Sequence, residues 1–308
     1  MNMSAAGAPK FAKALVTGAT GFLGSRLTAR LAESGTAVSA LIRRTSAPEK
    51  VAELPDSIDI IPADSDNEAL IAHVSKTTPD VIFHLAARYT YSYSLAEIPG
   101  LLSDNITLTA QICEAATTAG CTNLVVAGTA WQNAGSPPGD ESPAPNTLYA
   151  ATKQAADDII DYYAAASELN AVTLKIYDSY GPGDPRRKFL QALADAADTG
   201  ETLASTPGAQ LVHMVHAEDL VDGFVHAGNL LVSGKLAGRT SYTLPSQKSV
   251  SLRELVEIWQ TATDNNVSVA WGANDYRDGE VMVPWEGTPL PGWSPQIDLE
   301  TGLRGLQN

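Results

Sequence analysis

Short apolar runs alternate with longer segments of helical periodicity through residues 1–180 of the chain. The apolar runs predict strands at residues 14–17, 38–42, 58–61, 81–85, 124–127 and 172–177. The longer segments predict helices at residues 22–33, 66–76, 101–119 and 149–169. Strands rich in β-branched residues that alternate with helices are typical of a parallel sheet covered on both faces. The pattern therefore predicts an α/β fold with a doubly wound parallel sheet.

The pattern changes after Gly181, where glycines and prolines interrupt the chain as far as Pro185. A helix is predicted at residues 186–197, and loops dominate beyond it. Proline and tryptophan are frequent over residues 284–295, near the end of the chain. This region predicts a smaller, irregular C-terminal lobe that covers one edge of the sheet. A cleft between two lobes is a common place for a ligand.

The composition narrows the class of protein. The chain has 308 residues, of which 44% are hydrophobic and 18% charged, as in a folded globular protein. Acidic residues number 35 against 20 basic ones, and the net charge of −15 repels a phosphate backbone, which excludes nucleic acid as a partner. Cys113 and Cys121 are too few for a disulfide framework. No apolar run approaches the ~20 residues of a membrane span, and no signal peptide is recognisable, so we expect a soluble cytoplasmic protein. The sequence predicts no metal site.

Three glycines at three-residue intervals follow the first predicted strand. In this position the first allows a tight turn, the second lets the backbone approach a pyrophosphate, and the third lets the helix pack on the strand. The helix then presents its N-terminal N–H groups to the phosphates. This context predicts a dinucleotide site, with a plain strand-to-helix turn as the alternative. The cofactor-binding residues expected here are Gly18, Thr20, Gly21, Phe22, Leu23 and Gly24.

The residues after the second predicted strand bear on the choice of cofactor. Arg43 and Arg44 follow this strand, and no Asp or Glu occurs between Ser34 and Pro48. A carboxylate there would bind the ribose 2′-OH of NAD, whereas a guanidinium matches the 2′-phosphate of NADP. The sequence therefore favours NADP(H) over NAD(H), unless the two arginines only decorate a solvated loop. Asp64, after the third strand, is placed either to bind the adenine amino group or to cap a loop.

Tyr149 and Lys153 lie four residues apart in a predicted helix, so their side chains share one face. A nearby ammonium is expected to lower the pKa of a tyrosine from about 10 towards working pH, as acid–base chemistry between an alcohol and a ketone requires. Thr129 follows the fifth predicted strand, at the edge of the sheet where ligands bind in α/β proteins. Tyrosine and lysine at this spacing also occur by chance in many helices. Here the pair follows a glycine loop and the Thr129 hydroxyl in the order expected of a catalytic site, which favours that interpretation over chance.

The glycine loop, Thr129, Tyr149 and Lys153 together resemble the extended short-chain dehydrogenase/reductase superfamily, and the similarity covers nearly the whole chain. The resemblance implies that Tyr149 is the acid–base, Thr129 positions the substrate oxygen and Lys153 binds the nicotinamide ribose. It also implies further site residues, namely Leu85, Ala86 and Ala87 at the cofactor and Asn105 among the catalytic residues.

The same resemblance implies a division into domains. Residues 216–220 resemble the strand that returns to the sheet. The dinucleotide-binding Rossmann domain is then expected to span residues 1–180, with residues 212–240 returning to it. Residues 181–211 and 241–308 are expected to form the substrate-binding lobe.

Two departures from the superfamily pattern narrow the reaction. Ala130 and Trp131 follow Thr129 where sugar-nucleotide 4,6-dehydratases carry an Asp-Glu pair that eliminates water, so 4,6-dehydration is disfavoured. Residues 211–212, Leu-Val, stand where many relatives carry an arginine for the nucleotide diphosphate. Arg277 matches a second phosphate-binding arginine, or else forms a surface ion pair. The expected substrate-binding residues are Thr129, Ala130, Trp131 and Arg277.

Residues 128–133, 148–154 and 178–182 most resemble reductases of nucleotide-linked 4-keto deoxysugars, of the CDP-abequose and CDP-paratose synthase type. The first hypothesis is therefore NADPH-dependent reduction of the C4 ketone of a nucleotide-linked deoxyhexulose in deoxysugar biosynthesis. One alternative is a sugar-nucleotide 4-epimerase that retains NAD. Another is a catalytically idle NADP-binding regulator, which the intact tyrosine and lysine argue against.

The resemblance also predicts a homodimer, because the family often dimerises through the helices expected at residues 101–119 and 149–169. The second helix carries apolar residues at three- and four-residue spacing: Ala155, Ile159, Tyr162, Tyr163 and Ala166. A helix that is apolar on more than one face needs a partner beyond its own sheet. The alternative is that these side chains pack inside the monomer.

Overall fold

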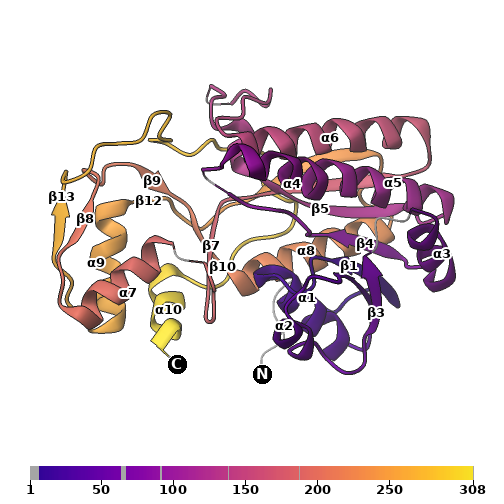
Figure 1. The fold of residues 1–308 in the computed structure, drawn as a ribbon, viewed down its shortest axis with the longest axis horizontal. Coiled ribbons are helices and arrows are strands. Elements are labelled where there is room, and N and C mark those ends of the chain that lie inside the picture. The colour runs from indigo at the N-terminus through magenta and orange to yellow at the C-terminus, as the bar shows by residue number, and fades with distance from the viewer. Residues whose placement is uncertain (1–6, 64–66, 91, 138, 187, 308) are drawn as a thin grey trace.

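The computed structural model describes residues 7–63, 67–90, 92–137, 139–186 and 188–307. Its central feature is a seven-stranded parallel sheet (Figure 1). The strands are β1 (Lys13–Thr17), β2 (Ala37–Arg43), β3 (Asp59–Ala63), β4 (Val81–His84), β5 (Asn123–Thr129), β6 (Asn170–Ile176) and β11 (Arg239–Leu244). Their order across the sheet is β11-β6-β5-β4-β1-β2-β3, which is the order of a doubly wound sheet and confirms the predicted fold class.

Helices cover both faces of the sheet (Figure 1). One face carries α1 (Phe22–Glu33), α2 (Pro48–Ala52) and α8 (Ala217–Val232), and the other α3 (Asn67–Thr77), α4 (Ile98–Leu102), α5 (Leu108–Thr118) and α6 (Leu148–Ala166). Successive strand residues point to opposite faces, so in β1 Val16 packs towards α1 and α8 while Leu15 packs towards α3 and α5. Because both faces are buried, the strands are continuous apolar runs, which made them recognisable in the sequence. No helix in the described part of the chain is long and apolar enough to cross a membrane.

A smaller lobe is built from the C-terminal part of the chain. Its elements are α7 (Phe189–Thr199), β8 (Leu203–Ser205), β9 (Leu211–Val212), β12 (Val250–Ser251), α9 (Leu252–Thr263), β13 (Val269–Trp271) and α10 (Leu299–Arg304). The lobe has a core of its own, in which Leu193, Leu255, Trp259 and Leu303 are buried. Its strands form only isolated pairs, β9 with β12 and β8 with β13, so the lobe is as irregular as expected.

The segment between the lobes differs from the prediction. The short strand β10 (Met214–His216) pairs with β7 (Asp178–Tyr180) and not with the large sheet, and α8 begins at Ala217. The returning strand expected at 216–220 was therefore wrong. Most of α8 is buried, but Glu218, Asp222 and His226 recur at four-residue spacing along it, a helical signal that the resemblance to a strand overrode. The strand that completes the sheet is β11, beside β6, and the expected domain boundary at residue 240 falls inside it.

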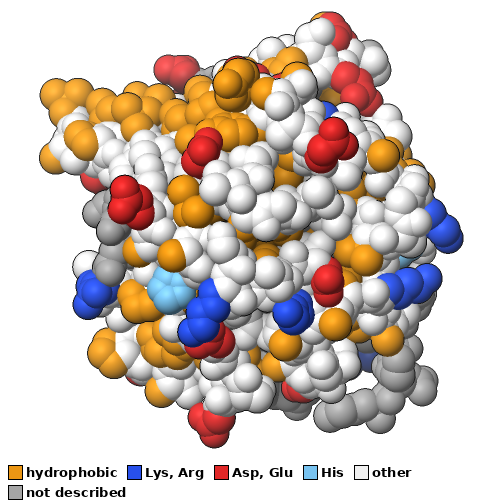
Figure 2. Space-filling model, turned by 90° about the vertical axis from the view of Figure 1, so that its right-hand side faces the viewer, with side chains coloured by type: hydrophobic (Ala, Val, Ile, Leu, Met, Phe, Trp, Pro, Cys, Tyr) orange, Lys and Arg blue, Asp and Glu red, His pale blue; other side chains and the backbone are white. Residues whose placement is uncertain are grey.

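The outer face of α5 and α6 carries both packed and exposed aromatic side chains. Tyr163 lies half-buried, and its Oη donates a hydrogen bond to Glu114 Oε2 on α5 at 2.9 Å. The neighbouring Tyr162 is 67% exposed and lies edge-on to the ring of Tyr163. Figure 2 shows hydrophobic side chains gathered along the upper edge of the molecule, the side on which α5 and α6 lie in Figure 1. Tyr163 thus packs within the monomer, whereas Tyr162 is exposed and accessible to a second copy of the chain.

We propose that α5 and α6 pack against those of a second copy about a two-fold axis. Tyr162→Glu would place a charge in this interface and should raise the dissociation constant of the dimer about tenfold or more. Leu95→Glu, at a side chain that is 85% exposed and outside both helices, should leave it unchanged. Sedimentation velocity over a dilution series measures both. A wild-type chain that sediments as a monomer at every concentration contradicts the proposal.

Candidate active site

Gly18 and Gly24 of the first loop occupy positions that admit no side chain, and Gly21 occupies a tight one. Gly18 has a positive φ of 71°, and a Cβ there would lie 2.7 Å from the backbone nitrogen of Ala86. A Cβ on Gly24 would lie 2.0 Å from the carbonyl oxygen of Gly18, and one on Gly21 3.2 Å from the same oxygen. The loop therefore lies directly against the chain that leaves β4, where Ala86 N donates to Thr17 Oγ1 at 3.1 Å. The expected cofactor residues of the loop and of segment 85–87 are thus brought together.

The residues around the loop fit a dinucleotide. Gly21 caps α1 without a side chain, so the N–H groups of the first helical turn face the loop, where an anion binds well. The side chain of Lys153 is buried, and its Nζ has no hydrogen-bond partner among the described residues. Burial lowers the pKa of Lys153 to about 8, and the negative charge of Asp157 opposes this decrease. A buried ammonium without a partner suits a ligand that brings hydroxyl groups, as a ribose does.

Tyr149 and Lys153 lie one turn apart near the start of α6, which Thr147 caps by accepting a hydrogen bond from Ala150 N. Burial raises the pKa of Tyr149 above its ordinary value, Tyr89 adds to the rise, and the charge of Arg186 opposes it. The ring of Tyr89 lies edge-on to that of Tyr149, with ring centres 5.0 Å apart. We expected the lysine to lower this pKa, but the cost of burying a phenolate is the larger effect. The site therefore holds Tyr149 as a protonated phenol.

Thr129 ends β5 and begins a short 3₁₀ turn, η3 (Ala130–Asn133), that contains the expected substrate residues Ala130 and Trp131. Its hydroxyl oxygen accepts a hydrogen bond from Trp131 N at 3.3 Å, and its backbone N–H donates to Gln132 Oε1 at 2.9 Å. The hydroxyl proton of Thr129 can therefore still be donated to a ligand.

Asn105 lies in a π-helical turn, η2 (Ser103–Thr107), between α4 and α5. Its Oδ1 accepts from Arg88 N at 2.7 Å, and its Nδ2 donates to Arg88 O at 3.0 Å and to Thr152 Oγ1 at 2.9 Å. These contacts use both donors of the amide. Asn105 thus joins the segment after β4 to α6, and its expected catalytic role stays a prediction.

The two arginines after β2 lie at an exposed end of the sheet. Arg43 Nη1 lies 3.0 Å from Asp104 Oδ2, and Arg88 Nε lies 2.9 Å from the same oxygen. Arg43 is therefore ion-paired, a contact that its place in the sequence did not predict. Two guanidinium groups share one carboxylate, so this cluster keeps a net positive charge. Asp64 lies outside the described residues.

A cleft of about 1480 Å³ separates the two lobes. Its lining includes Ala130, Trp131, Lys188 and Arg277, and also Tyr89, whose ring packs on that of Tyr149. Ala130, Trp131 and Arg277 were expected to bind substrate, although they are distant in the sequence. The structure places all three at the border of one cleft.

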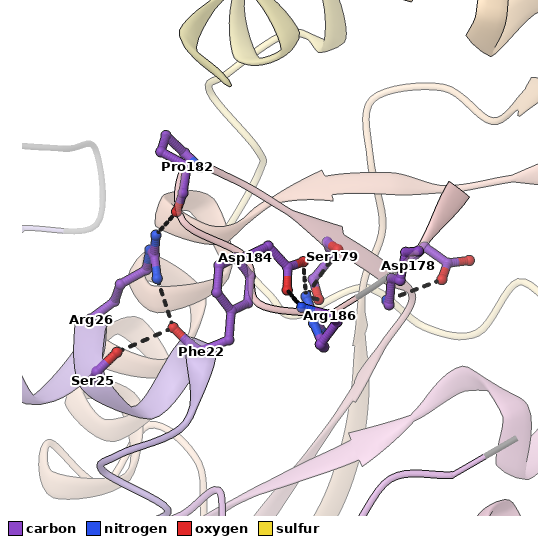
Figure 3. Close-up of polar contacts among 9 residues, drawn as sticks. Phe22, Ser25, Arg26, Asp178, Ser179, Pro182, Asp184 and Arg186 are labelled. Atoms are coloured by element: carbon purple, nitrogen blue, oxygen red, sulfur yellow. Dashed lines mark hydrogen bonds and ion pairs between the residues drawn. The ribbon is translucent and has the colours of Figure 1, made fainter. Parts of the chain in front are cut away.

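Phe22 connects the glycine loop with the wall of this cleft (Figure 3). Its ring lies between two guanidinium groups, 4.3 Å from Arg26 and 4.5 Å from Arg186. Arg26 also donates hydrogen bonds to the carbonyl oxygens of Phe22 and Pro182, while Arg186 binds both carboxylate oxygens of Asp184 at 2.6 Å.

Arg186 and Lys188 were missed in the sequence. Both line the cleft, and Lys188 Nζ lies 3.5 Å from Asp178 Oδ1. The available signal was the basic run at residues 186–188, directly after the glycines and prolines that lead into the second lobe.

Gly24→Ala should weaken dinucleotide binding, because the new Cβ would force the helix away from the glycine loop. The expected loss is at least tenfold, the equivalent of about 1.4 kcal/mol. Gly305→Ala is the matched control, since a Cβ there meets nothing within 4 Å. Fluorescence titration with reduced dinucleotides measures the affinity, and circular dichroism checks the fold. Equal affinity of the two variants would show that the loop does not hold the cofactor.

Comparison with known proteins gives three results. The model of the "NAD dependent epimerase/dehydratase family" matches residues 14–237. The chain is 27% identical to the CDP-abequose synthase of Yersinia pseudotuberculosis, over 88% of this chain and 90% of the relative. It is 29% identical to the UDP-glucose 4-epimerase of Mycolicibacterium smegmatis, over 94% of this chain and 96% of the relative.

Among solved structures, MoeE5 in complex with UDP-glucuronic acid and NAD superposes with a TM-score of 0.77 at 27% identity, covering 94% of this chain and 96% of that one. The glycine loop, the Tyr149–Lys153 pair and the two-lobed architecture thus occur in a chain that the family model matches over most of its length. The protein belongs to the NAD-dependent epimerase/dehydratase family of the extended short-chain dehydrogenases/reductases.

Proposed function

We propose that the protein is an NADPH-dependent reductase of the C4 ketone of a nucleotide-linked deoxyhexulose. The observation that carries the proposal is the pairing of a protonated Tyr149 with a turn after Thr129 that lacks carboxylates. A protonated phenol is the form that donates a proton to the oxygen of a ketone as it becomes an alcohol. The likeness to CDP-abequose synthase and to a UDP-sugar complex supports a nucleotide-linked sugar as substrate.

Each side chain has a stated task in this reaction. A bound nicotinamide supplies the hydride. Tyr149 donates its phenolic proton to the C4 oxygen, and the hydroxyl of Thr129 donates a hydrogen bond to the same oxygen. Lys153 stabilises the phenolate that remains on Tyr149 and binds the ribose hydroxyls. Lys153 is buried and Tyr149 half-buried, and these surroundings reduce contact with water and strengthen the interactions.

The turn after Thr129 offers no group for eliminating water. Ala130 and Trp131 carry no acid. Gln132 and Asn133, which follow them, are buried, and their amides are already bonded within the protein. A ketone reductase needs neither an acid nor a base here beyond Tyr149, whereas 4,6-dehydration does.

We assign the diphosphate of the substrate to Lys188 and Arg277, which both line the cleft. Val212 of β9 stands where many relatives carry an arginine, so this chain needs cations from other elements. An ammonium and a guanidinium can each bind phosphate oxygens, the second of them bidentately.

The second candidate is a sugar-nucleotide 4-epimerase. The 29% identity to the UDP-glucose 4-epimerase of Mycolicibacterium smegmatis and the NAD in the MoeE5 complex favour it. The two reactions differ in cofactor use, because a reductase consumes reduced cofactor and an epimerase does not. NADPH oxidation with a panel of nucleotide-linked 4-keto sugars tests the proposal. Interconversion of UDP-hexoses without consumption of cofactor contradicts it and favours the epimerase.

Tyr149→Phe keeps the ring and removes the proton donor. Turnover should fall by about 10²–10⁴, as is typical for loss of a general acid, while cofactor affinity stays near wild type. Tyr162→Phe removes a hydroxyl from the exposed side of the same helix and should leave turnover unchanged. Steady-state kinetics and cofactor titration measure the two effects separately. Near-normal turnover of Tyr149→Phe on a true substrate would refute the assignment of this residue.

The cofactor preference is tested at the end of β2. Replacing Arg43 and Arg44 together with alanine should weaken NADPH binding about tenfold or more, the effect of losing one charge-assisted hydrogen bond, with a smaller change for NADH. The reason is that Arg43 and Arg88 share the carboxylate of Asp104, whose single negative charge cannot neutralise both guanidinium groups. Lys50→Ala, at a surface pair with Glu53, is a control that also removes a positive charge. Wild-type protein that binds NADH as tightly as NADPH would contradict the preference.

A further inference from the structure

Asp157 lies on α6 one turn beyond Lys153, with its side chain buried against the sheet. Its carboxylate contacts three different elements. Thr173 Oγ1 on β6 donates to Oδ1 at 2.6 Å, and Gln132 Nε2 on η3 donates to Oδ2 at 2.7 Å. Arg239 Nη2 on β11 lies 2.8 Å from Oδ1. A single buried carboxylate therefore joins the catalytic helix to the turn after Thr129 and to two strands.

Two acceptors, the carboxylate of Asp157 and Gln154 Oε1, determine which way the amide of Gln132 faces. Its Nε2 donates to Asp157, so its Oε1 is turned towards the backbone N–H of Thr129, from which it accepts a hydrogen bond at 2.9 Å. Gln132 is fully buried, and its Nε2 also donates a hydrogen bond to Gln154 Oε1 at 3.1 Å. The amide thus has little room for another orientation. The backbone of Thr129 is held through Gln132 by Asp157.

The second link is electrostatic. Lys153 has no hydrogen-bond partner for Nζ among the described residues, and the negative charge of Asp157 opposes the effect of burial on its pKa. Tyr149 on the same helix is neutral, and burial lowers the pKa of His84 on β4 to about 3, so this imidazole is also neutral. Lys175 on β6 and Arg239 on β11 are cations that also lie near Asp157. None of these other groups supplies the negative charge that an ammonium in this place requires.

We propose that Asp157 is a positioning residue with two tasks, which are to fix the turn that presents Thr129 and to keep Lys153 positively charged. The proposal rests on the proposed function in that Thr129 and Lys153 act on substrate and cofactor. A carboxylate that served only to join the elements would fix the turn that presents Thr129, but it would not be needed to keep Lys153 charged.

Asp157→Asn keeps the shape of the side chain and removes its charge. Because Lys153 is protonated below its pKa of about 8 and loses its charge above it, activity and cofactor affinity should both decline on the alkaline side. Without the charge of Asp157 that decline should move to lower pH by about one unit. Asp161→Asn is the matched control, since Asp161 lies one turn further along α6, is 57% exposed and pairs with the same Arg239. It should leave the pH profile unmoved.

Two further variants separate the tasks. Thr173→Val removes one hydrogen bond to the carboxylate and keeps its charge, so it should lower the melting temperature and not shift the pH profile. Gln132→Met breaks the link to Thr129, so it should reduce kcat without moving the alkaline decline or the cofactor affinity. This variant also tests the first task if Asp157→Asn does not fold.

The readouts are the pH dependence of NADPH oxidation and, independently of any substrate, the pH dependence of NADPH binding by fluorescence. An alkaline decline that moves in Asp157→Asn and not in Asp161→Asn supports the proposal. An unmoved decline in Asp157→Asn, or an unchanged kcat in Gln132→Met, overturns the corresponding task. If wild-type protein reduces no 4-keto sugar, the proposed function fails, and the binding measurement still decides the role of Asp157.

Discussion

The ammonium of Lys153 is removed from water beside the carboxyl end of the sheet, and no described residue accepts a hydrogen bond from it. A buried charge of this kind is costly and persists only where the surroundings compensate for it. Asp157 provides part of the compensation through its negative charge, and the ribose hydroxyls of a dinucleotide would provide the hydrogen bonds. The phenol of Tyr149, one turn earlier on the same helix, is kept protonated by the same burial. The chemistry proposed for the protein follows from this shared environment.

The sheet makes that environment possible by bringing separate strands to one edge. The turn after β1 is so close to the chain leaving β4 that Gly18 admits no side chain. The turn after β5 is held by Gln132, and the loop after β7 carries Arg186 to the ring of Phe22. Cofactor loop, catalytic turn and substrate cleft therefore share contacts. A change at Phe22 or Arg186 would affect the cofactor loop and the cleft wall together.

Much of the fold was predictable, because strands buried on both faces are continuous apolar runs and the glycine loop has a fixed spacing. The helix α8 was not predicted, because the resemblance placed a strand at residues 216–220, although Glu218, Asp222 and His226 recur at helical spacing. Among candidate site residues, Thr129, Tyr149 and Lys153 were predicted from their order and spacing, and the structure places them at the end of β5 and near the start of α6. The hydrogen bonds of Asn105, the pairing of Arg43 with Asp104 and the contacts of Asp157 depend on residues that only the folded chain brings together. The direction of the pKa change at Tyr149 depends likewise on burial, which spacing along a helix does not report.

The central claim is that this site transfers hydride to the C4 carbon of a nucleotide-linked sugar and adds a proton from Tyr149 to its oxygen. Incubation with NADPH deuterated at the transferable position and a nucleotide-linked 4-keto deoxysugar tests it directly. The account predicts one deuterium at C4 of the product, found by NMR and mass spectrometry, for each NADPH oxidised. A product without deuterium at C4, or conversion of one hexose epimer to the other with the NADPH unconsumed, would contradict it.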